Sequence, residues 1–332
     1  MVNASGKRAL GATVILVLTA VAFILAITLG AAELPLRTVI AALLGDATAT
    51  DRAIVIELRL PRAMLASLAG GALALSGAVF QALLRNPLAE PYVLGVSGGA
   101  AVGAVSAIVL GMEGAAPWLI PVAALLGALA AILLVLRIAI QAGHALDTRV
   151  LLLAGVIAGA FFNAVILLLL TLADVESFRS AIFWMMGSLA GATWRSCMLL
   201  ALYVLPALLA LLSLARPLNL LAAGEETALY LGTRVDRVKT VAYFVASFLV
   251  AATVATCGVI GFIGLVVPHA IRLMFGSDHR FLLPVCFLAG GSFLLLADTG
   301  ARTMAAPAEL PVGVITALIG VPIFVVLLRR RA

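Results

Sequence analysis

The sequence predicts an all-α integral membrane protein with about ten transmembrane helices. Of its 332 residues, 64% are hydrophobic and only 11% are charged, whereas an average soluble domain carries about 25% charged residues. The mean hydropathy is +1.25. Several apolar stretches run for about 18 residues or more without a charge, which is enough for a helix to cross a bilayer. A bundle of such spans folds as one unit, so we expect a single transmembrane domain over residues 1–332.

Ten hydrophobic segments follow one another along the chain, and two of them, 93–110 and 260–275, are short. The first segment begins after Lys7 and Arg8 and is too long for the apolar region of a signal peptide, so we interpret it as a span. The other eight segments cover residues 9–30, 61–83, 117–138, 149–172, 196–215, 238–257, 281–297 and 311–328.

The basic residues predict how the spans are oriented. With the N-terminus in the cytoplasm, 14 of the 21 Lys and Arg residues lie inside and seven lie outside, which is the bias that cytoplasmic loops carry. Both termini are then cytoplasmic. This bias also accounts for the net charge of +6, so nucleic acid is not an expected partner. The three cysteines are isolated and form no CxxC pair, so no metal site is expected.

Three connections are long enough to hold structure of their own: residues 31–60 and 173–195 outside, and 216–239 inside. The inner connection contains Pro217, the sequence GEETALYLG with two adjacent glutamates, and Gly232. Proline and acidic residues favour the start of a helix, and glycine favours its end. The pattern predicts a short helix over about residues 218–232, lying outside the bilayer on the cytoplasmic side.

A weak internal repeat connects the two halves of the chain. A shift of 181 residues aligns segments that would run in opposite directions through the membrane, and inverted repeats are common in transporters. The aligned pairs are Gly77 with Gly258, Pro87 with Pro268, and Gly95 with Gly276.

The stretch from Ser76 to Gly103 supports two interpretations. Pro87 and Pro91 interrupt the helix, and the glycines that follow have the small-residue spacing of a close helix–helix contact. The same glycines frame Ser97 in a G-x-S-x-G pattern, for which His269 could serve as a base in an intramembrane serine protease. A soluble nucleophile elbow needs a strand–turn–helix context that this sequence lacks, so the hydrolase is the lesser alternative.

The energy source separates the remaining classes. No GxxxxGK[ST] motif occurs, so the chain cannot hold ATP phosphates by that means. No acidic residue is placed near the middle of a predicted span, which disfavours an ion-coupled secondary carrier. If transport is driven by ATP, a separate ATPase subunit must supply the energy.

Several motifs from the second span to the last resemble the iron-chelate, haem and cobalamin family of permeases, the large ten-span class of ABC importers. NPLAEP and GFIGLVVPHAIR are the most specific of them. The resemblance covers nearly the whole chain. The matching strings are ELRLPR (57–62), SGAVFQALLRNPLAEPYVLGVSGGA (76–100), LLLAGV (151–156), FWMMGSLAGATW (183–194), GEETALYLG (224–232), GVIGFIGLVVPHAIR (258–272) and AELPVGVITALIGVPIFVVLL (308–328).

The resemblance implies a non-catalytic permease subunit in the inner membrane. Its implied partners are a second copy of the permease, two ATPase subunits and a periplasmic or lipid-anchored substrate-binding protein. The chain itself would bind no cofactor, whereas the ATPase would use ATP and Mg. The implied cargo is a bulky metal chelate, a ferric siderophore or haem first and cobalamin as a further option.

The resemblance also implies residue roles. The GEETALYLG helix would couple to the ATPase, three outer arginines would dock the binding protein, and residues near the second and fifth spans would form the cytoplasmic gate. Arg179 is expected to attract an anionic chelate, and Asp147 stands where a small hydroxyl residue would be expected. The coupling residues are Gly224, Glu225, Glu226, Thr227, Ala228, Leu229, Leu231 and Gly232, the docking residues Arg59, Arg62 and Arg302, and the gate residues Asn86, Leu88, Asp147 and Thr148.

Overall fold

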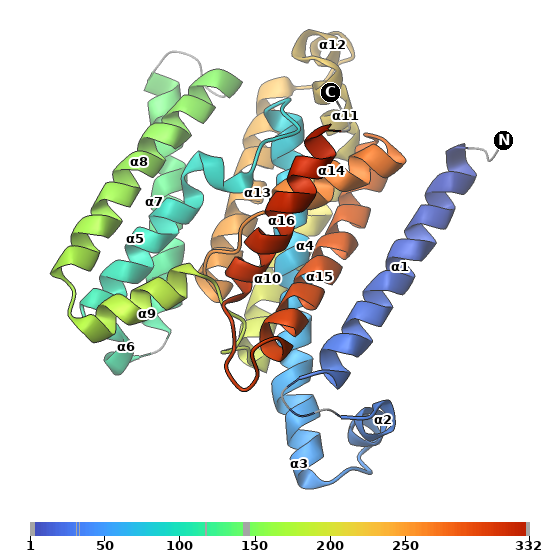
Figure 1. Ribbon diagram of the computed structural model, residues 1–332. Helices are drawn as coiled ribbons and strands as arrows, with labels where there is room; N and C mark the ends of the chain where they lie inside the picture. The colour runs from blue at the N-terminus through green and yellow to red at the C-terminus, as the bar shows by residue number, and fades with distance from the viewer. Residues whose placement is uncertain (1–3, 31, 33, 117, 142–146, 330–332) are drawn as a thin grey trace.

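Each of the ten predicted hydrophobic segments coincides with a helix in the computed structural model, which describes all residues except 1–3, 31, 33, 117, 142–146 and 330–332 (Figure 1). Among the described residues, seven helices are long and apolar enough to cross a membrane, while α5, α14 and α16 are shorter. The described residues contain no strand. The ten helices are α1 (Ala4–Thr28), α4 (Leu60–Leu83), α5 (Val96–Val109), α7 (Leu119–Gln141), α8 (Thr148–Leu172), α10 (Trp194–Ser213), α13 (Val235–Cys257), α14 (Ile263–Phe275), α15 (His279–Thr303) and α16 (Val312–Arg329).

Helix α4 is the centre of the bundle and is buried along most of its length. It lies against α15, α13, α14 and α10. Small residues let these backbones approach closely: a Cβ on Gly70 would lie 2.2 Å from the carbonyl oxygen of Gly290 in α15. Any larger residue at either position would separate the two helices that carry Arg62, Asp298 and Arg302.

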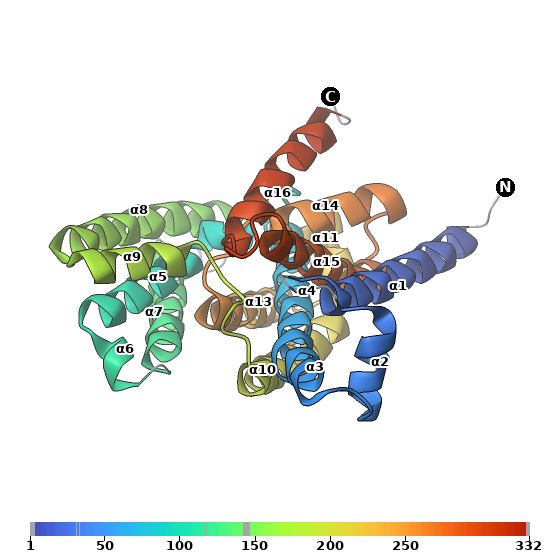
Figure 2. The same cartoon turned by 60° about the horizontal axis from the view of Figure 1, so that its bottom comes forward.

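The remaining helices flank this centre on two sides. Figure 2 shows α1 on one side of α4 and α15, and the group α5 to α9 on the other. Within that group α5 packs on α7, where a Cβ on Gly99 would lie 2.5 Å from the carbonyl oxygen of Gly127. The glycines of the GVSGG string therefore form the helix–helix seam that their spacing predicted.

The three long connections are largely helical. Residues 31–60 hold α2 (Leu36–Leu44), α3 (Ala49–Arg52) and the π-helical η1 (Ala53–Arg59), which continues into α4. Residues 173–195 hold α9 (Val175–Met185). Two further short elements, η2 (Pro91–Leu94) and α6 (Met112–Ala115), adjoin α5.

The inner connection corrects one prediction. The single helix expected over residues 218–232 is two helices, α11 (Ala215–Ala223) and α12 (Glu225–Tyr230). Gly224 separates them with a φ of 135°, a conformation that only glycine adopts readily, so the chain turns there and α12 starts in a new direction.

The connections collect at two opposite ends of the bundle. The start of α1, the end of α16, α11 and α12 lie at one end, while α2, α3, α6 and the α15–α16 connection lie at the other (Figure 1). The weak inverted repeat stays a prediction. At its proline pair the two halves differ in local structure, because Pro87 lies in a turn and Pro268 lies inside α14.

Candidate functional site

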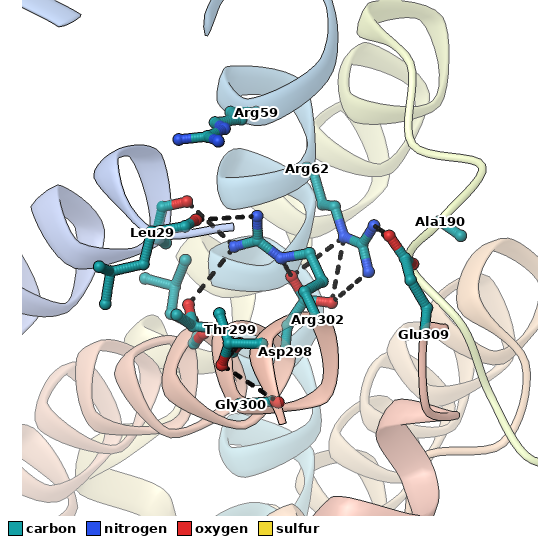
Figure 3. A network of polar contacts seen from close by, with 12 residues as sticks. Leu29, Arg59, Arg62, Ala190, Asp298, Thr299, Gly300, Arg302 and Glu309 are labelled. Atoms are coloured by element: carbon teal, nitrogen blue, oxygen red, sulfur yellow. Dashed lines mark hydrogen bonds and ion pairs between the residues drawn. The ribbon is translucent and has the colours of Figure 1, made fainter. Parts of the chain in front are cut away.

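A buried carboxylate organises the end of the bundle that carries the three outer arginines. Asp298 of α15 is 2% exposed and lies between two guanidinium groups (Figure 3). Arg62 of α4 donates from Nε to both Asp298 oxygens at 3.1 Å and from Nη2 to Oδ1 at 2.9 Å. Arg302, one turn after Asp298, places its Nε 3.1 Å from Oδ2. The pairing compensates the desolvation that a lone charge would suffer in this setting.

The other arginine donors bind the end of α1. Arg59 donates from Nη1 to the carbonyl oxygens of Ile27 and Thr28, each at 2.7 Å, and from Nη2 to that of Ala32. Arg302 donates from Nη2 to Ala26 at 3.0 Å and from Nη1 to the carbonyl of Leu29 at 3.3 Å. The last carbonyls of a helix have no partner within it and carry partial negative charge, so cationic donors suit them.

The three predicted docking arginines therefore form one cluster, with their guanidinium groups turned into the protein. Arg59 and Arg302 are buried, and the Arg62 side chain is only 12% exposed. Their docking role stays a prediction, and any partner must reach groups that are already hydrogen-bonded within the chain.

Glu309 is the exposed member of this cluster. It lies in the connection between α15 and α16, its side chain is 43% exposed, and both its oxygens accept from Arg62 Nη1, at 3.0 and 2.9 Å (Figure 3). It also lines a cavity of about 390 Å³ together with residues of α9 and with Ser188 and Ala190.

Sequence reasoning missed both acidic residues. The ninth segment was ended at residue 297, but α15 continues to Thr303, which places Asp298 inside the helix and close to its end. The i,i+4 spacing of Asp298 and Arg302 on an apolar helix was the available signal. Glu309 gave no such signal, because it reaches Arg62 from 247 residues away.

At the opposite end, Glu225 joins the predicted coupling and gate residues. It is the first residue of α12, and its Oε1 lies 2.7 Å from Lys239 Nζ of α13 and 3.3 Å from Arg85 Nη2. Arg85 has a φ of 45° and starts the turn after α4. Asn86 follows at once and accepts from the N–H of Leu88 at 2.9 Å. We call this turn, which holds the predicted gate residues Asn86 and Leu88, the gate turn. Through its contact with Arg85, the Glu225 carboxylate connects α12 to the gate turn.

The second half of the predicted gate lies in the same place. Asp147 is the N-cap of α8 and accepts from the N–H of Arg149 at 2.7 Å. A small hydroxyl residue at this position could cap the helix in the same way. Thr148 Oγ1 lies 3.4 Å from the carbonyl oxygen of Leu83, the last residue of α4. With Arg85, Glu225 and Lys239, these residues line a polar recess of about 580 Å³. The structure thus brings Asp147 and Thr148 of the predicted gate together with Glu225 of the predicted coupling helix.

The turn after α4 is also fixed to the start of α14. Glu90 accepts from the N–H of Phe262 at 3.0 Å, and Tyr92 OH lies 2.9 Å from the carbonyl oxygen of Ile260. Burial raises the pKa of the Glu90 carboxyl, and the bond from Phe262 opposes this. The NPLAEP and GFIGLVVPHAIR strings, the two most specific motifs, are therefore in direct contact.

The two groups proposed for a serine hydrolase have separate surroundings. The glycines beside Ser97 lie against Ala158 and Phe162 of α8, whereas the ring of His269 in α14 faces Phe324 of α16, with centroids 6.1 Å apart. No described strand precedes the serine. The structure therefore gives Ser97 a packing environment and offers no support for the hydrolase.

Two further features bear on a cargo. Arg179 of α9 is exposed and lies 5.7 Å from the ring centre of Phe183, and its contact with a cargo stays a prediction. An apolar recess of about 620 Å³ lies between the end of α9, the residues before α14, and α16. Met186, Phe262 and Leu318 are among its lining residues.

Comparisons with known proteins agree on one family. The profile of the FecCD transport family matches residues 18–330. The cobalamin import system permease protein BtuC of Halobacterium salinarum is 48% identical over 285 residues, covering 85% of this chain and 75% of that protein. The vitamin B12 import system permease protein BtuC of Escherichia coli O17:K52:H18 is 45% identical over 287 residues, covering 86% and 87%.

Two solved structures share this fold. A metal-chelate type ABC transporter in an inward-facing conformation superposes with a TM-score of 0.87 at 32% identity, covering 96% of this chain and 98% of that one. PsaBC from Streptococcus pneumoniae, solved in complex with a Fab, has a TM-score of 0.55 at 16% identity over 80% of this chain and 89% of that one, a likeness of fold alone.

Proposed function

This chain belongs to the FecCD transport family, and from that premise we propose that, paired with a second copy, it forms the membrane path of an importer for cobalamin. It is a multi-pass permease subunit of an ABC importer. The proposal that cobalamin is the cargo is supported by the 45–48% identity to permeases named for cobalamin and vitamin B12. The sequence motifs alone placed siderophore and haem before cobalamin, and the relatives reverse that order.

In this proposal α12 docks on a separate ATPase subunit that uses ATP and Mg. Leu229, Tyr230 and Leu231 are 58%, 91% and 62% exposed, at an end of the bundle where connections gather. A contiguous exposed apolar patch outside the span region indicates a protein partner, and an exposed tyrosine is a common anchor in such interfaces. This end would face the cytoplasm, together with both termini.

Movement of α12 would reach the gate through Glu225. The carboxylate contacts Arg85, which starts the gate turn, and Lys239, which lies in the first turns of α13. A shift of α12 therefore changes the position of a charge that both elements share. This contact supports the assignment of Asn86, Leu88, Asp147 and Thr148 to the gate.

The arginine end would face the binding protein, periplasmic or lipid-anchored. Guanidinium forks recognise carboxylates well, which suits acidic docking residues on a partner. Between the two ends, the apolar recess beside α16 would contribute a wall of the path in the paired permease. Weakly interacting walls suit a path, because release requires that the cargo bind less tightly in one state than in the other.

ATP hydrolysis by the permease co-purified with its ATPase in lipid tests this function. Candidate binding proteins loaded with cobalamin, haem or a ferric siderophore are added in turn. We expect the largest stimulation with the cobalamin-loaded protein, and ATP-dependent uptake of cobalamin in vesicles. Stimulation by the haem- or siderophore-loaded protein instead would overturn the assignment of cobalamin as the cargo. Ion-driven uptake by the permease alone would overturn the assignment of an ATP-driven importer.

A further inference from the structure

The partners of the three docking arginines differ in one respect. Arg59 and Arg302 are buried and bind carbonyl oxygens near the end of α1, and Arg302 also pairs with Asp298. Arg62 gives Nε and Nη2 to the same buried carboxylate. Its remaining nitrogen, Nη1, is bound by Glu309, whose side chain is 43% exposed (Figure 3). Among the carboxylates of this cluster, Glu309 is therefore the one that solvent can reach.

We propose that Glu309 holds, on Arg62, the position that a carboxylate of the docking binding protein takes over. This inference rests on the proposed function, because it assumes that Arg62 docks that partner. Asp298 is 2% exposed and cannot be exchanged for an outside group without leaving a buried cation short of its counter-charge. Glu309 can be exchanged, because its own side chain is 43% exposed and an incoming carboxylate would restore the charge pair on Arg62.

Exchange of one carboxylate for another keeps Arg62 satisfied in both states. Without a partner, Glu309 accepts from the Nη1 donors that would otherwise face a nearly closed site. With the partner bound, the Asp298 contacts persist and continue to orient the guanidinium fork. Glu309 thus keeps the docking arginine in its binding geometry while making the partner compete for it.

Glu309 lies in a connection that leads to the helices bordering the proposed path. Leu310 and Pro311 lead directly into α16, and the N–H of Gly313 donates to the carbonyl oxygen of Met186 at 3.1 Å. Glu309 also lines the 390 Å³ cavity with Phe183 of α9. Both α9 and α16 border the larger apolar recess. Release of Glu309 would loosen the connection that holds the start of α16.

Binding of the partner to the permease–ATPase complex in lipid nanodiscs tests the exchange. The probe is the loaded binding protein that stimulates ATP hydrolysis in the assay above, and biolayer interferometry gives its Kd. We expect Glu309→Gln to tighten binding about threefold, because the partner's carboxylate would no longer compete with Glu309 for Arg62. Glu57→Gln is the matched control: Glu57 is exposed, lies in η1 at the same end, and makes no ion pair within the described residues, so its Kd should not change.

Arg62→Gln separates docking through Arg62 from the carboxylate exchange at Glu309. It should weaken binding more than about tenfold, since truncating one side of a buried charge contact is costly, and Glu309→Gln should then have no further effect. If Arg62→Gln fails to fold, Arg62→Lys keeps a cation beside Asp298 and loses only the fork, and should weaken binding severalfold. Weakened or unchanged binding of Glu309→Gln would overturn the exchange alone, whereas wild-type binding by both Arg62 variants would overturn docking through Arg62.

Discussion

The two ends of the bundle hold charge clusters of opposite construction. Around Asp298, the carboxylate and its partner Arg62 have side chains 2% and 12% exposed and share three hydrogen bonds. At the other end the carboxylate of Glu225 is 32% exposed and meets Lys239 and Arg85 through one oxygen, and the Arg85 side chain is 47% exposed. The cluster around Asp298 is closed, whereas the Glu225 cluster is open on its Arg85 side and has one buried member, Lys239, whose side chain is 9% exposed.

This difference separates stability from movement. A buried, fully paired network is costly to disturb and fixes the geometry of the elements that it joins. Half-exposed ion pairs contribute little free energy and can be remade at small cost. The arginine end thus holds the ends of α1, α4 and α15 in place, whereas the proposed coupling role requires the Glu225 contacts to change with the position of α12.

The largest effect is expected from Asp298→Asn. It leaves two buried guanidinium groups without their shared counter-charge, and breaking a buried pair in this way costs about 3–5 kcal/mol. Thermal unfolding of the purified permease in detergent measures the loss. Asp46→Asn is the control, because Asp46 is exposed at the same end, in the turn after α2, and makes no ion pair within the described residues.

A small change for Asp298→Asn would break the comparison. If the two Asp variants unfold at the same temperature, the arginine end is no more stabilising than an exposed turn. Its burial would then have to be explained by specificity of packing.

The next effect is expected from Tyr230→Ala in α12. Tyr230 is 91% exposed, so its removal should leave the unfolding temperature of the permease unchanged. If it anchors the ATPase, truncation should cost about 1–2 kcal/mol of binding, or roughly a tenfold weaker complex. Leu44→Ala, 74% exposed in α2 at the opposite end, should leave the affinity for the ATPase as it is. Equal affinities for all three proteins would remove α12 from the interface.

A smaller effect is expected from Glu225→Gln, and it should appear in coupling before stability. The variant loses the half-exposed ion pair with Arg85, worth under about 1 kcal/mol, and leaves the Lys239 side chain, which is 9% exposed, with a neutral acceptor in place of a carboxylate. We expect about a fivefold lower ratio of cargo transported to ATP hydrolysed. Glu226→Gln removes the same charge from the same helix without breaking an ion pair in the described part of the chain, and should lose less. Equal losses would show that charge, and not the contact to Arg85, is what matters.

The sequence predicted the spans well for a physical reason. A bilayer fixes both the length and the apolar character of a crossing helix, so composition locates ten apolar helices, seven of which are long enough, within the described residues, to cross a membrane. The family resemblance also grouped Arg59, Arg62 and Arg302, and the structure places them in one cluster. The break at Gly224 was missed, because Pro217 and Gly232 were interpreted as the start and stop of one helix, whereas Glu225 and Glu226 begin a second helix. The φ of a glycine is set by its surroundings and gave no signal.

The partners in the charge clusters could not be predicted from one sequence. Arg62 and Asp298 are 236 residues apart, and Arg85 and Glu225 are 140 apart. Such pairs are set by how the helices pack, and no local pattern encodes them. The predicted gate and coupling residues could each be named from motifs, but the contact between Glu225 and Arg85 is a property of the fold.

The smallest effect is expected from Asp278→Asn. Asp278 lies just before α15, at the same end of the bundle as Glu225, and its contribution to stability should depend on pH and salt. Its carboxylate accepts from Asn219 Nδ2 at 2.9 Å and from Arg8 Nη1 at 3.0 Å, and the Arg8 side chain is 41% exposed. The bond from Asn219, followed by those from the Arg280 N–H and Arg8, lowers the pKa of Asp278 below its ordinary value of 3.8. A lowered folded pKa stabilises the protein above pH 3.8, and this stability is lost as the pH falls through the folded value.

At pH 7 the Asp278→Asn variant should therefore be less stable by under about 1 kcal/mol, and the gap should close in acid and shrink in about 1 M salt. The gap of Asp298→Asn should persist in the same salt, because buried pairs are screened far less. Thermal unfolding of both variants across salt and pH measures the contrast. If salt closed both gaps equally, the arginine end would be as open to solvent as the other, and a carboxylate exchange confined to Glu309 would lose its structural basis.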